Sequence, residues 1–290
     1  MKKKQYLLKA SLIFLALLTF IPVWMVIVAA FSDESAIAQH GFSLWASKWS
    51  LTGIRYVMTF GWQLADAYKV TLLVAVAGTL ITLMATSLFA YALSRNDFRL
   101  RKALTVYLLI TMIFSGGQLG SYLINSNVFH MRNSLWVLIL PGSVSAMNCI
   151  IMRSFVQSNV PDALLEAAKI DGANEYRVFF QIVLPLMAPV LGAIGFMTAV
   201  GHWNQWQTSM LFITDRKLVT LQHLLMQIEN TLAYLSEAEN LTQSEVELWT
   251  TMPTESGRMA LLLCTLGPVL VIYPFFQKYF VKGLTIGAVK

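Results

Sequence analysis

Residues 161–185 read PDALLEAAKIDGANEYRVFFQIVLP and form a polar segment between two long apolar ones. Pro161 suits the first turn of a helix and Gly172 suits the position just past a helix end, so the segment predicts a helix of about three turns. Asp162 lies near the positive end of this helix and Lys169 near its negative end, as the helix dipole favours. We expect a short polar helix that meets another protein.

One face of this predicted helix carries small side chains. Leu164, Ala167, Ala168 and Asp171 recur at helical spacing. Because alanine has a short side chain, a foreign surface could approach this face closely. After Gly172 the chain turns, and residues 176–182 predict a second short helix before Pro185.

The order Glu166-Ala167-Ala168, then Gly172, then Leu184-Pro185, set between two apolar segments, resembles the EAA loop of ABC importer permeases. In that family the loop contains the coupling helix, which docks into a cleft of the ATP-hydrolysing subunit. The resemblance implies that six residues dock here: Glu166, Ala167, Ala168, Lys169, Asp171 and Gly172. The alternative is an ordinary amphipathic cytoplasmic loop.

Nearly the whole chain is similar to the second permease subunit of maltose-type carbohydrate importers, and its PTESGRMA and YPFFQKYFVKG stretches resemble the oligosaccharide-type subgroup. The resemblance implies an all-α membrane protein with six transmembrane helices and the type I ABC importer permease fold. It also implies a second homologous permease subunit, two ATP-binding subunits and an extracellular solute-binding protein as partners. ATP and Mg would bind to the ATPase subunits, with no cofactor in this chain.

Composition independently indicates a membrane protein. Of the 290 residues, 57% are hydrophobic and only 12% are charged, and the mean hydropathy is +0.61. The net charge of +6 does not indicate nucleic-acid binding, because the basic residues lie beside apolar runs and form no long basic stripe. Cys149 and Cys264 fall inside apolar segments, where we expect small core residues rather than a disulfide.

Six apolar segments are predicted to cross the membrane. They are 8–31, 68–93, 103–124, 135–155, 186–212 and 257–276. Between and after them we expect a cytoplasmic coupling loop at 156–185, an outer segment at 214–255 and a cytoplasmic tail at 277–290. A cleaved secretory signal is the alternative for the first segment, but its apolar run, 10–31, is too long for a typical signal.

The basic residues predict the orientation. In the six-span scheme, fourteen of the twenty-one Lys and Arg residues lie on the side that carries both termini and the coupling loop. The positive-inside rule places this side in the cytoplasm. We therefore expect a multi-pass protein of the bacterial cell membrane with both termini cytoplasmic.

Polar and aromatic residues near or within the apolar segments predict a substrate path. Aromatic faces beside amide groups suit sugar rings and their hydroxyls. The candidates are Gln118, Asn148, His202, Trp203, Asn204 and Trp206. Alternatives are close helix packing around Gln118, a hydrogen bond from Asn148 to a neighbouring helix, which we favour, and an interfacial aromatic belt for the tryptophans.

The outer segment 214–255 predicts a surface helix, because Leu221, Leu224 and Ile228 recur at helical spacing. Its glutamates could steer a basic patch of a binding protein, although a solvated acidic face is the more common meaning. Glu255 and Arg258 are spaced to form an ion pair, or to touch substrate or binding protein.

The motifs that are missing restrict the function. The sequence has no G-x-x-x-x-G-K-S/T phosphate loop, no H-E-x-x-H, no C-x-x-C and no nucleophile elbow, so we expect a transport subunit without an ATPase site and not an enzyme. The predicted spans hold almost no carboxylates, which disfavours a proton- or sodium-driven carrier. The alternatives are an ABC permease for a non-sugar solute and a membrane receptor or scaffold without transport.

Overall fold

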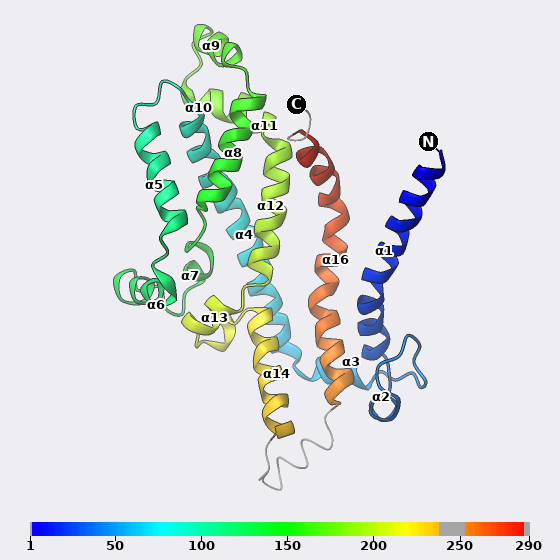
Figure 1. The fold of residues 1–290 in the computed structure, drawn as a ribbon. Helices are drawn as coiled ribbons and strands as arrows, with labels where there is room; N and C mark the ends of the chain where they lie inside the picture. The colour runs from blue at the N-terminus through cyan, green and yellow to red at the C-terminus, as the bar shows by residue number, and fades with distance from the viewer. Residues whose placement is uncertain (1, 238–252, 287–290) are drawn as a thin grey trace. The chain divides into compact units, whose positions relative to one another are not determined.

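The computed structural model describes residues 2–237 and 253–286 (Figure 1). Within these ranges the only pairing of the β type is one isolated bridge between Ser32 and Trp49, and all other regular structure is helical. The first helices are α1 (Lys2–Ala30), α2 (Glu34–His40), α3 (Thr52–Thr59), α4 (Gly61–Ser94), α5 (Arg101–Ile113), α6 (Gly117–Leu123) and the π-helix η1 (Ile124–Val128). The middle of the chain forms α7 (Leu135–Ile139), α8 (Ala146–Asn159), α9 (Asp162–Ile170), α10 (Glu175–Val178), the π-helix η2 (Phe179–Val183), α11 (Leu184–Leu186) and α12 (Ala188–Trp203). The last helices are α13 (Gln207–Phe212), the short 3-10 helix η3 (Arg216–Leu218), α14 (Leu221–Glu237) and α16 (Thr254–Ile286).

The chain divides into two compact units. Unit 1 contains Met1–Ala65 and Leu224–Val271, and unit 2 contains Asp66–His223 and Ile272–Lys290. The predicted coupling loop and all of the predicted substrate-path residues belong to unit 2.

Three helical stretches among the described residues are long and apolar enough to cross a bilayer. They are Leu8–Ala30 in α1, Gly61–Ser94 (α4) and Thr254–Pro274 in α16. These correspond to the predicted first, second and sixth spans. α16 continues to Ile286, so the predicted boundary between the last span and the tail, at residue 276, is not a helix end.

The other three predicted spans are interrupted. Arg101–Ile113 and Gly117–Val128, in the third, meet at a bend of 115°. The fifth, 186–212, is interrupted at 204–206 between α12 and α13, and at its start Glu175–Leu186 and Ala188–Trp203 meet at 78°. If each bent pair is one span, the described residues contain up to five. The predicted fourth span, 135–155, is divided between α7 and α8 by six residues that are not helical. The count of six is therefore not confirmed by these helices.

Glycine and proline mark these interruptions. Gly117 and Gly142 have φ values of +71° and +80°, in the left-handed region where glycine carries no steric penalty. Pro141 precedes the second of these, and Pro189 lies in the first turn of α12, just after the 78° bend. A proline ring cannot donate the backbone hydrogen bond that would continue a helix through such a point.

In unit 1, the carboxylate of Glu34 caps the N-terminus of α16. Oε1 accepts hydrogen bonds from Thr254 Oγ1 at 2.9 Å and from the Glu255 N–H at 2.8 Å. Oε2 accepts from the Ser256 N–H at 2.9 Å and from Ser256 Oγ at 2.7 Å. Burial alone would raise the pKa of Glu34, but these donors hold the pKa below its usual range. The carboxylate therefore stays charged where the helix dipole favours an anion.

α3 and the start of α16 approach each other backbone to backbone. A Cβ added at Gly53 would lie 2.5 Å from the carbonyl oxygen of Ser256 and 3.2 Å from that of Ala30. A Cβ added at Gly257 would lie 2.9 Å from the ring of Tyr56. Glycine is thus required at Gly53 for space, because the atom it would meet belongs to the backbone and cannot rotate away.

In unit 2, the core lies between α4, α8, α9, the α10–η2 segment and α12. Its buried members are Ala90, Tyr91, Met152, Val156, Val160, Leu165, Ala168, Val178, Phe179, Val183, Met187, Val190 and Ile194. Asn133, at a φ of +53°, joins the start of α7 to the end of α13. Its Oδ1 accepts from the Thr214 and Asp215 N–H groups at 2.6 and 3.1 Å, and its own N–H donates to the Phe212 carbonyl at 3.0 Å.

The predicted surface helix of the outer segment exists as α14, and Leu221, Leu224 and Ile228 are buried as its periodicity predicts. Arg258 pairs with Glu255 at 3.1 Å, as its spacing predicts, and also with Glu229 at 3.1 Å. The structure does not describe most of the other glutamates of the outer segment. It also does not describe the side chains of the predicted tail, 277–290.

Replacing Gly53 by alanine should destabilise unit 1. The added Cβ would overlap the Ser256 carbonyl, and overpacking of this kind typically costs about 1–3 kcal/mol. We expect Gly53→Ala to lower the apparent melting temperature of the detergent-purified protein. The matched control is Gly120→Ala in α6, where nothing lies within 4 Å of the new Cβ and alanine favours a helix by about 0.5–1 kcal/mol. Equal melting temperatures for the two variants would contradict the close approach.

Candidate functional site

α9 begins and ends as its sequence predicts. Pro161, with extended backbone angles, immediately precedes the helix. Past the other end, Gly172 has a φ of +78°, and its N–H donates to the Lys169 carbonyl at 3.0 Å. The Ala173 N–H donates to the Ala168 carbonyl at 2.9 Å. These two bonds form a Schellman motif, which satisfies carbonyls at the helix end and turns the chain back.

One side of α9 is packed into unit 2. Leu165 is 4% exposed and Ala168 is 7% exposed, and both belong to the core that contains Phe179. The prediction that Ala168 lies on an outward face with Ala167 is therefore wrong. Ala167 is exposed, whereas the small side chain of Ala168 lets α9 sit close to the core.

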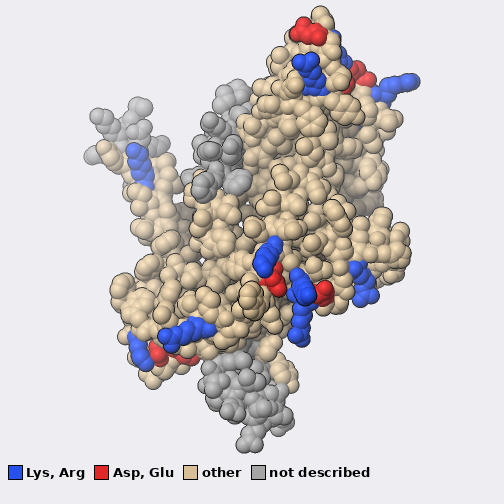
Figure 2. Space-filling view, turned by 180° about the vertical axis from the view of Figure 1, so that it is seen from behind, with Lys and Arg blue, Asp and Glu red and all other residues tan. Residues whose placement is uncertain are grey.

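The other side of α9 combines charged and large apolar side chains. Glu166 and Asp171 are exposed. Ile170 is 87% exposed, and Tyr176, at the following turn, is 74% exposed. Figure 2 shows charged side chains gathered at this end of the molecule, at the top of the view, above a band of uncharged ones. Exposed apolar side chains in such a charged setting are typical of a docking surface. Ile170 is not among the docking residues predicted from the sequence, although a large apolar residue beside Asp171 is a sign of an apolar contact at this helix end.

A network of polar side chains, here called the Asp97 network, joins the end of α9 to the end of α4. Its members are Tyr91, Arg95, Asp97, Lys169 and Glu175. Arg95 donates to both carboxylate oxygens of Asp97, at 3.0 and 2.6 Å. Lys169 Nζ lies 3.1 Å from Asp97 Oδ2 and 3.1 Å from Glu175 Oε1. Tyr91 Oη donates to Glu175 Oε2 at 2.8 Å.

The network keeps Asp97 and Lys169 charged. Hydrogen bonding from Arg95 holds the pKa of Asp97 well below its usual range, and Lys169 adds to the effect. In turn, Glu175 and then Asp97 raise the pKa of Lys169. The bidentate contact between Arg95 and Asp97 has the geometry of a strong charge-assisted pair. In the sequence, Arg95 is only one of the basic residues that predict the orientation, and no spacing pairs it with residues of the predicted coupling loop.

A cavity of about 200 Å³ lies between the base of α9, the end of α4 and the end of α8. It is lined by Ser94, Arg95, Asn96, Val156, Gln157, Val160, Pro161, Asp162 and Leu165. Within the described ranges, no group of three His, Cys, Asp or Glu side chains could hold a metal ion.

The end of α12 holds two of the predicted substrate-path residues in packing roles. Trp203 is 6% exposed, and its ring centroid lies 6.3 Å from that of Tyr68 on α4. His202 Nδ1 lies 3.2 Å from Gln205 Oε1, and a Cβ added at Gly78 would lie 2.6 Å from His202 Nε2. Both rings thus pack α12 against α4, and Trp203 offers little open face to a sugar ring.

Three other candidates remain accessible. Asn204 is exposed at the end of α12, and its Oδ1 accepts from Gln222 Nε2 at 3.1 Å. Trp206 is half-buried just before α13. Gln118 is exposed on α6, just past the 115° bend. They lie on separate elements, and none of the hydrogen bonds within the described residues joins Gln118 to the end of α12.

Asn148 lies half-buried near the start of α8. The sequence favours a hydrogen bond from the Asn148 side chain to a neighbouring helix. Among the described residues this side chain makes no hydrogen bond, so the predicted bond is not present in this structure. Its neighbour Cys149 is fully buried and free, as the sequence predicts for a small core residue.

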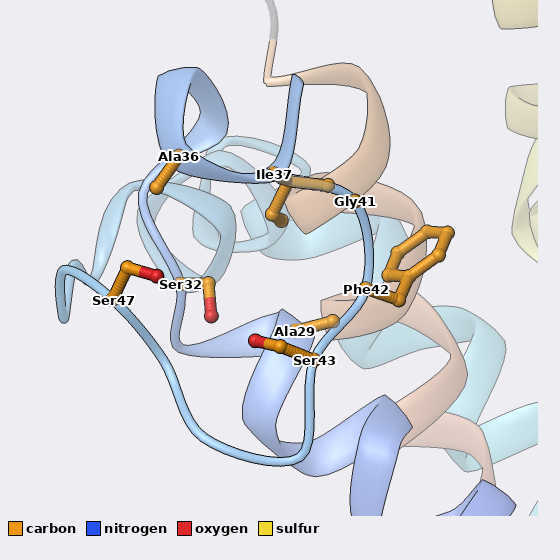
Figure 3. A pocket seen from close by; sticks show the side chains of 8 residues that line it. All are labelled: Ala29, Ser32, Ala36, Ile37, Gly41, Phe42, Ser43 and Ser47. Atoms are coloured by element: carbon orange, nitrogen blue, oxygen red, sulfur yellow. The ribbon is translucent and has the colours of Figure 1, made fainter. Parts of the chain in front are cut away.

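A hollow in unit 1 is too small to hold a solute (Figure 3). The close-up shows side chains from the end of α1, from α2 and from the loop after it around this space. Its lining residues are Ala29, Ser32, Ala36, Ile37, Gly41, Phe42, Ser43 and Ser47. The cavity volume is about 10 Å³, at the lower limit for a single water molecule.

Comparison with known proteins gives consistent matches along the chain. The family described as binding-protein-dependent transport system inner membrane component matches residues 2–286. The chain is 35% identical to the polygalacturonan/rhamnogalacturonan transport system permease protein YtcP of Bacillus subtilis. The match runs over 284 residues, which are 98% of this chain and 97% of YtcP. It is 33% identical over 274 residues to protein LplC of the same organism, covering 94% and 90%.

A solved structure has the same fold. It is the crystal structure of a bacterial ABC transporter involved in the import of the acidic polysaccharide alginate. One chain of that transporter matches with a TM-score of 0.81 and 22% sequence identity, over 96% of this chain and 97% of that chain.

The Asp97 network should make stability depend on pH in a defined direction. Because the folded-state pKa of Asp97 is depressed, its contribution is present above the unfolded-state pKa of about 4 and is lost as pH falls through the lower folded-state value. We expect Asp97→Asn to lower the melting temperature by a similar small amount at pH 6 and pH 8, and the difference from wild type to shrink below pH of about 4. A difference that grows as the pH is lowered would contradict the ion pairing.

Proposed function

The chain belongs to the family of binding-protein-dependent transport system inner membrane components, and on that premise we propose that it is a permease subunit of an ATP-driven importer for an oligosaccharide. Membership rests on the family match along residues 2–286 and on relatives that are 33–35% identical over almost the whole chain. The helical fold is shared with a chain of a bacterial ABC importer. The family assignment makes the protein a transport subunit rather than an enzyme.

The exposed side of α9 is the observation that carries the docking proposal. α9 is fixed from behind by Leu165 and Ala168, and it presents Glu166, Ala167 and Ile170 outward. A short helix held rigidly on one side and exposed on the other suits insertion into a partner's groove. We assign this role to the predicted docking residues Glu166, Ala167, Lys169, Asp171 and Gly172, with Ala168 as their support.

The partner at α9 is an ATP-hydrolysing subunit that binds ATP and Mg. Two such subunits would close on ATP and carry α9 with them, and the transmembrane helices would then alternate between inward- and outward-facing states. A second homologous permease would complete the path, and an extracellular solute-binding protein would deliver the solute. Each ligand drives this cycle only by binding the two states with different affinity.

The proposed substrate is an oligosaccharide. This is supported by the name of the YtcP relative, a permease for polygalacturonan and rhamnogalacturonan, and by the alginate importer with the same fold. Gln118, Asn204 and Trp206 are the candidate contacts that remain accessible, and amides beside an aromatic ring suit a sugar. Trp203 and His202 instead pack α12 against α4.

We propose six membrane crossings, with the first bent pair supplying the third, α7 and α8 together supplying the fourth, and α12 supplying the fifth. Non-helical backbone at membrane depth is tolerated where it is buried in protein or lines a wet cavity, so breaks do not preclude crossing. Fourteen of the twenty-one Lys and Arg residues lie on the side that carries α9 and both termini. This bias supports the proposal that this side faces the cytoplasm of a bacterial cell.

A cysteine at position 170 tests this orientation. In intact cells, Ile170→Cys should resist a membrane-impermeant maleimide and react only after the cells are permeabilised, because its side chain is 87% exposed on the cytoplasmic side. Trp62→Cys, at an 84% exposed position before the predicted second span, 68–93, lies on the outer side in the six-span scheme and should react without permeabilisation. The parent protein, with Cys149 and Cys264, supplies the background. Labelling of position 170 from outside would overturn the topology.

Charge reversal on the exposed side of α9 should uncouple the importer. We expect Glu166→Lys to reduce oligosaccharide uptake at least about tenfold while the protein still inserts. The reason is that the reversed charge would disrupt the proposed contact between α9 and the ATPase subunit. Gly172→Asp should act similarly by straining the left-handed turn at a φ of +78°.

The control is Asp66→Lys, an exposed charge reversal near the other end of α4. Uptake is measured with the glycan that the cognate binding protein selects from oligogalacturonides, alginate oligomers and neutral oligosaccharides. Normal uptake by Glu166→Lys and Gly172→Asp at wild-type expression would refute the docking assignment. A binding protein that selects none of these glycans would refute the substrate class.

A further inference from the structure

Peptide bonds connect α9 to α8 and, through α10, to α12, but only side chains connect it to α4. The loop between α4 and α5 comes close to α9 at the same end of unit 2 (Figure 1). α4 is the longest helix with most of its length in unit 2, at 34 residues. How α4 follows a movement of α9 is therefore a question about noncovalent contacts.

The covalent route from α9 to α12 is not a single straight helix. It passes through the π-helix η2 and then through a bend of 78° before α12 begins. A displacement of α9 therefore has to change direction along this route before it reaches α12.

The side-chain route to α4 is shorter and has two arms. In the first arm, Asp97 is held by both nitrogens of Arg95 on one side and by Lys169 of α9 on the other. In the second arm, Glu175 is held by Lys169 at 3.1 Å and by the hydroxyl of Tyr91 at 2.8 Å, with Arg95 farther away at 3.8 Å. Both arms meet at Lys169 and lead to the last turn of α4 or the residues directly after it.

An apolar contact supports the second arm. The ring centroid of Tyr91 lies 5.5 Å from that of Phe179, and both side chains are buried in the core that holds Leu165 and Ala168 of α9. Packed apolar side chains resist compression, whereas hydrogen bonds and ion pairs also resist separation in a defined direction. Together they let α9 both push and pull on the end of α4.

α4 then leads to the candidate substrate path. Gly78 is in close contact with His202 at the end of α12, and Thr71 Oγ1 accepts the Leu221 N–H at 2.8 Å. From Tyr91 to Gly78 the helix rises about 20 Å, at about 1.5 Å per residue. No proline interrupts α4. A continuous helix thus joins the Asp97 network to the neighbours of Asn204 and Trp206.

We propose that the Asp97 network is a mechanical link that makes α4 move with α9, and that Asp97 and Tyr91 are positioning residues for transport. The proposal rests on the proposed function, because it takes α9 as the site where the ATPase acts. Asp97 and Glu175 have side chains that are 58% and 54% exposed, so such ion pairs add little to folding stability. We therefore expect loss of these ion pairs to reduce the movement that α9 transmits along α4, rather than the stability of the fold.

The test breaks the α4 side of both arms and leaves α9 unchanged. Asp97→Asn removes the negative charge shared by Arg95 and Lys169 and one of its two acceptor oxygens. Tyr91→Phe removes one hydroxyl but keeps the ring that packs on Phe179. The double variant removes the Asp97 charge and the Tyr91 hydrogen bond, and leaves only the longer contact of Arg95 with Glu175, at 3.8 Å. Two variants serve as controls. Asp97→Glu keeps the negative charge and should keep α4 moving with α9. Arg99→Met removes a charge from the same loop, at a residue that forms no ion pair with any described residue.

Each variant is studied as the full transporter complex with its binding protein, in lipid. One reporter is Ile170→Cys, whose maleimide reactivity measures docking of the ATPase subunits. The second is Lys69→Cys, at a 71% exposed position near the other end of α4, whose change in reactivity on adding ATP measures movement of that helix. The rate of ATP hydrolysis is recorded alongside.

We expect ATPase subunits to protect Ile170→Cys equally in all variants. The ATP-dependent change at Lys69→Cys should fall by about threefold to tenfold in the double variant, less in each single one, and not in Asp97→Glu or Arg99→Met. A full change in the double variant, or no change at Lys69→Cys with the network intact, would overturn the link. Absence of protection at Ile170→Cys in the unmodified network would instead overturn the docking function.

Discussion

Backbone amide and carbonyl groups in the apolar interior of a membrane must find their hydrogen-bond partners within the protein, because no water is available to them. This constraint explains why the described residues form helices almost throughout. It also explains where this chain concentrates its polar chemistry. α4 carries no charged residue between Lys69 and Arg95, and the charged side chains gather directly beyond its end.

Helix ends and breaks leave backbone groups that the helix cannot satisfy, and this protein satisfies several of them with side chains distant in sequence. Glu34 caps α16 across 220 residues, and Thr71 accepts from the first residue of α14 across 150. Asn133 binds the backbone after α13. Each of these contacts therefore both completes a hydrogen-bond pattern and fixes the position of one segment against another.

α9 shows how a docking element can be both exposed and rigid. Its Schellman motif ends the helix, Leu165 and Ala168 hold it to the core, and the Asp97 network ties its last turn to the neighbouring loop. These three contacts restrain different directions of movement. The exposed residues between them, including Glu166 and Ile170, need only match the partner's surface.

The sequence by itself determined the membrane class, the helical fold, the family resemblance and the bounds of α9, because hydrophobic length, Pro161 and Gly172 act locally along the chain. It also placed the first, second and last apolar helices. Only the tertiary structure decided that Ala168 and Trp203 face inward, that the segments 103–124 and 135–155 are broken, and that Lys169 meets Asp97 and Glu175. Helical periodicity tells which residues share a face, but which face is buried depends on the neighbouring helices. Contacts such as that of Asp97 with Lys169 join residues 72 positions apart, so the path of the chain in space brings them together and no local pattern encodes them.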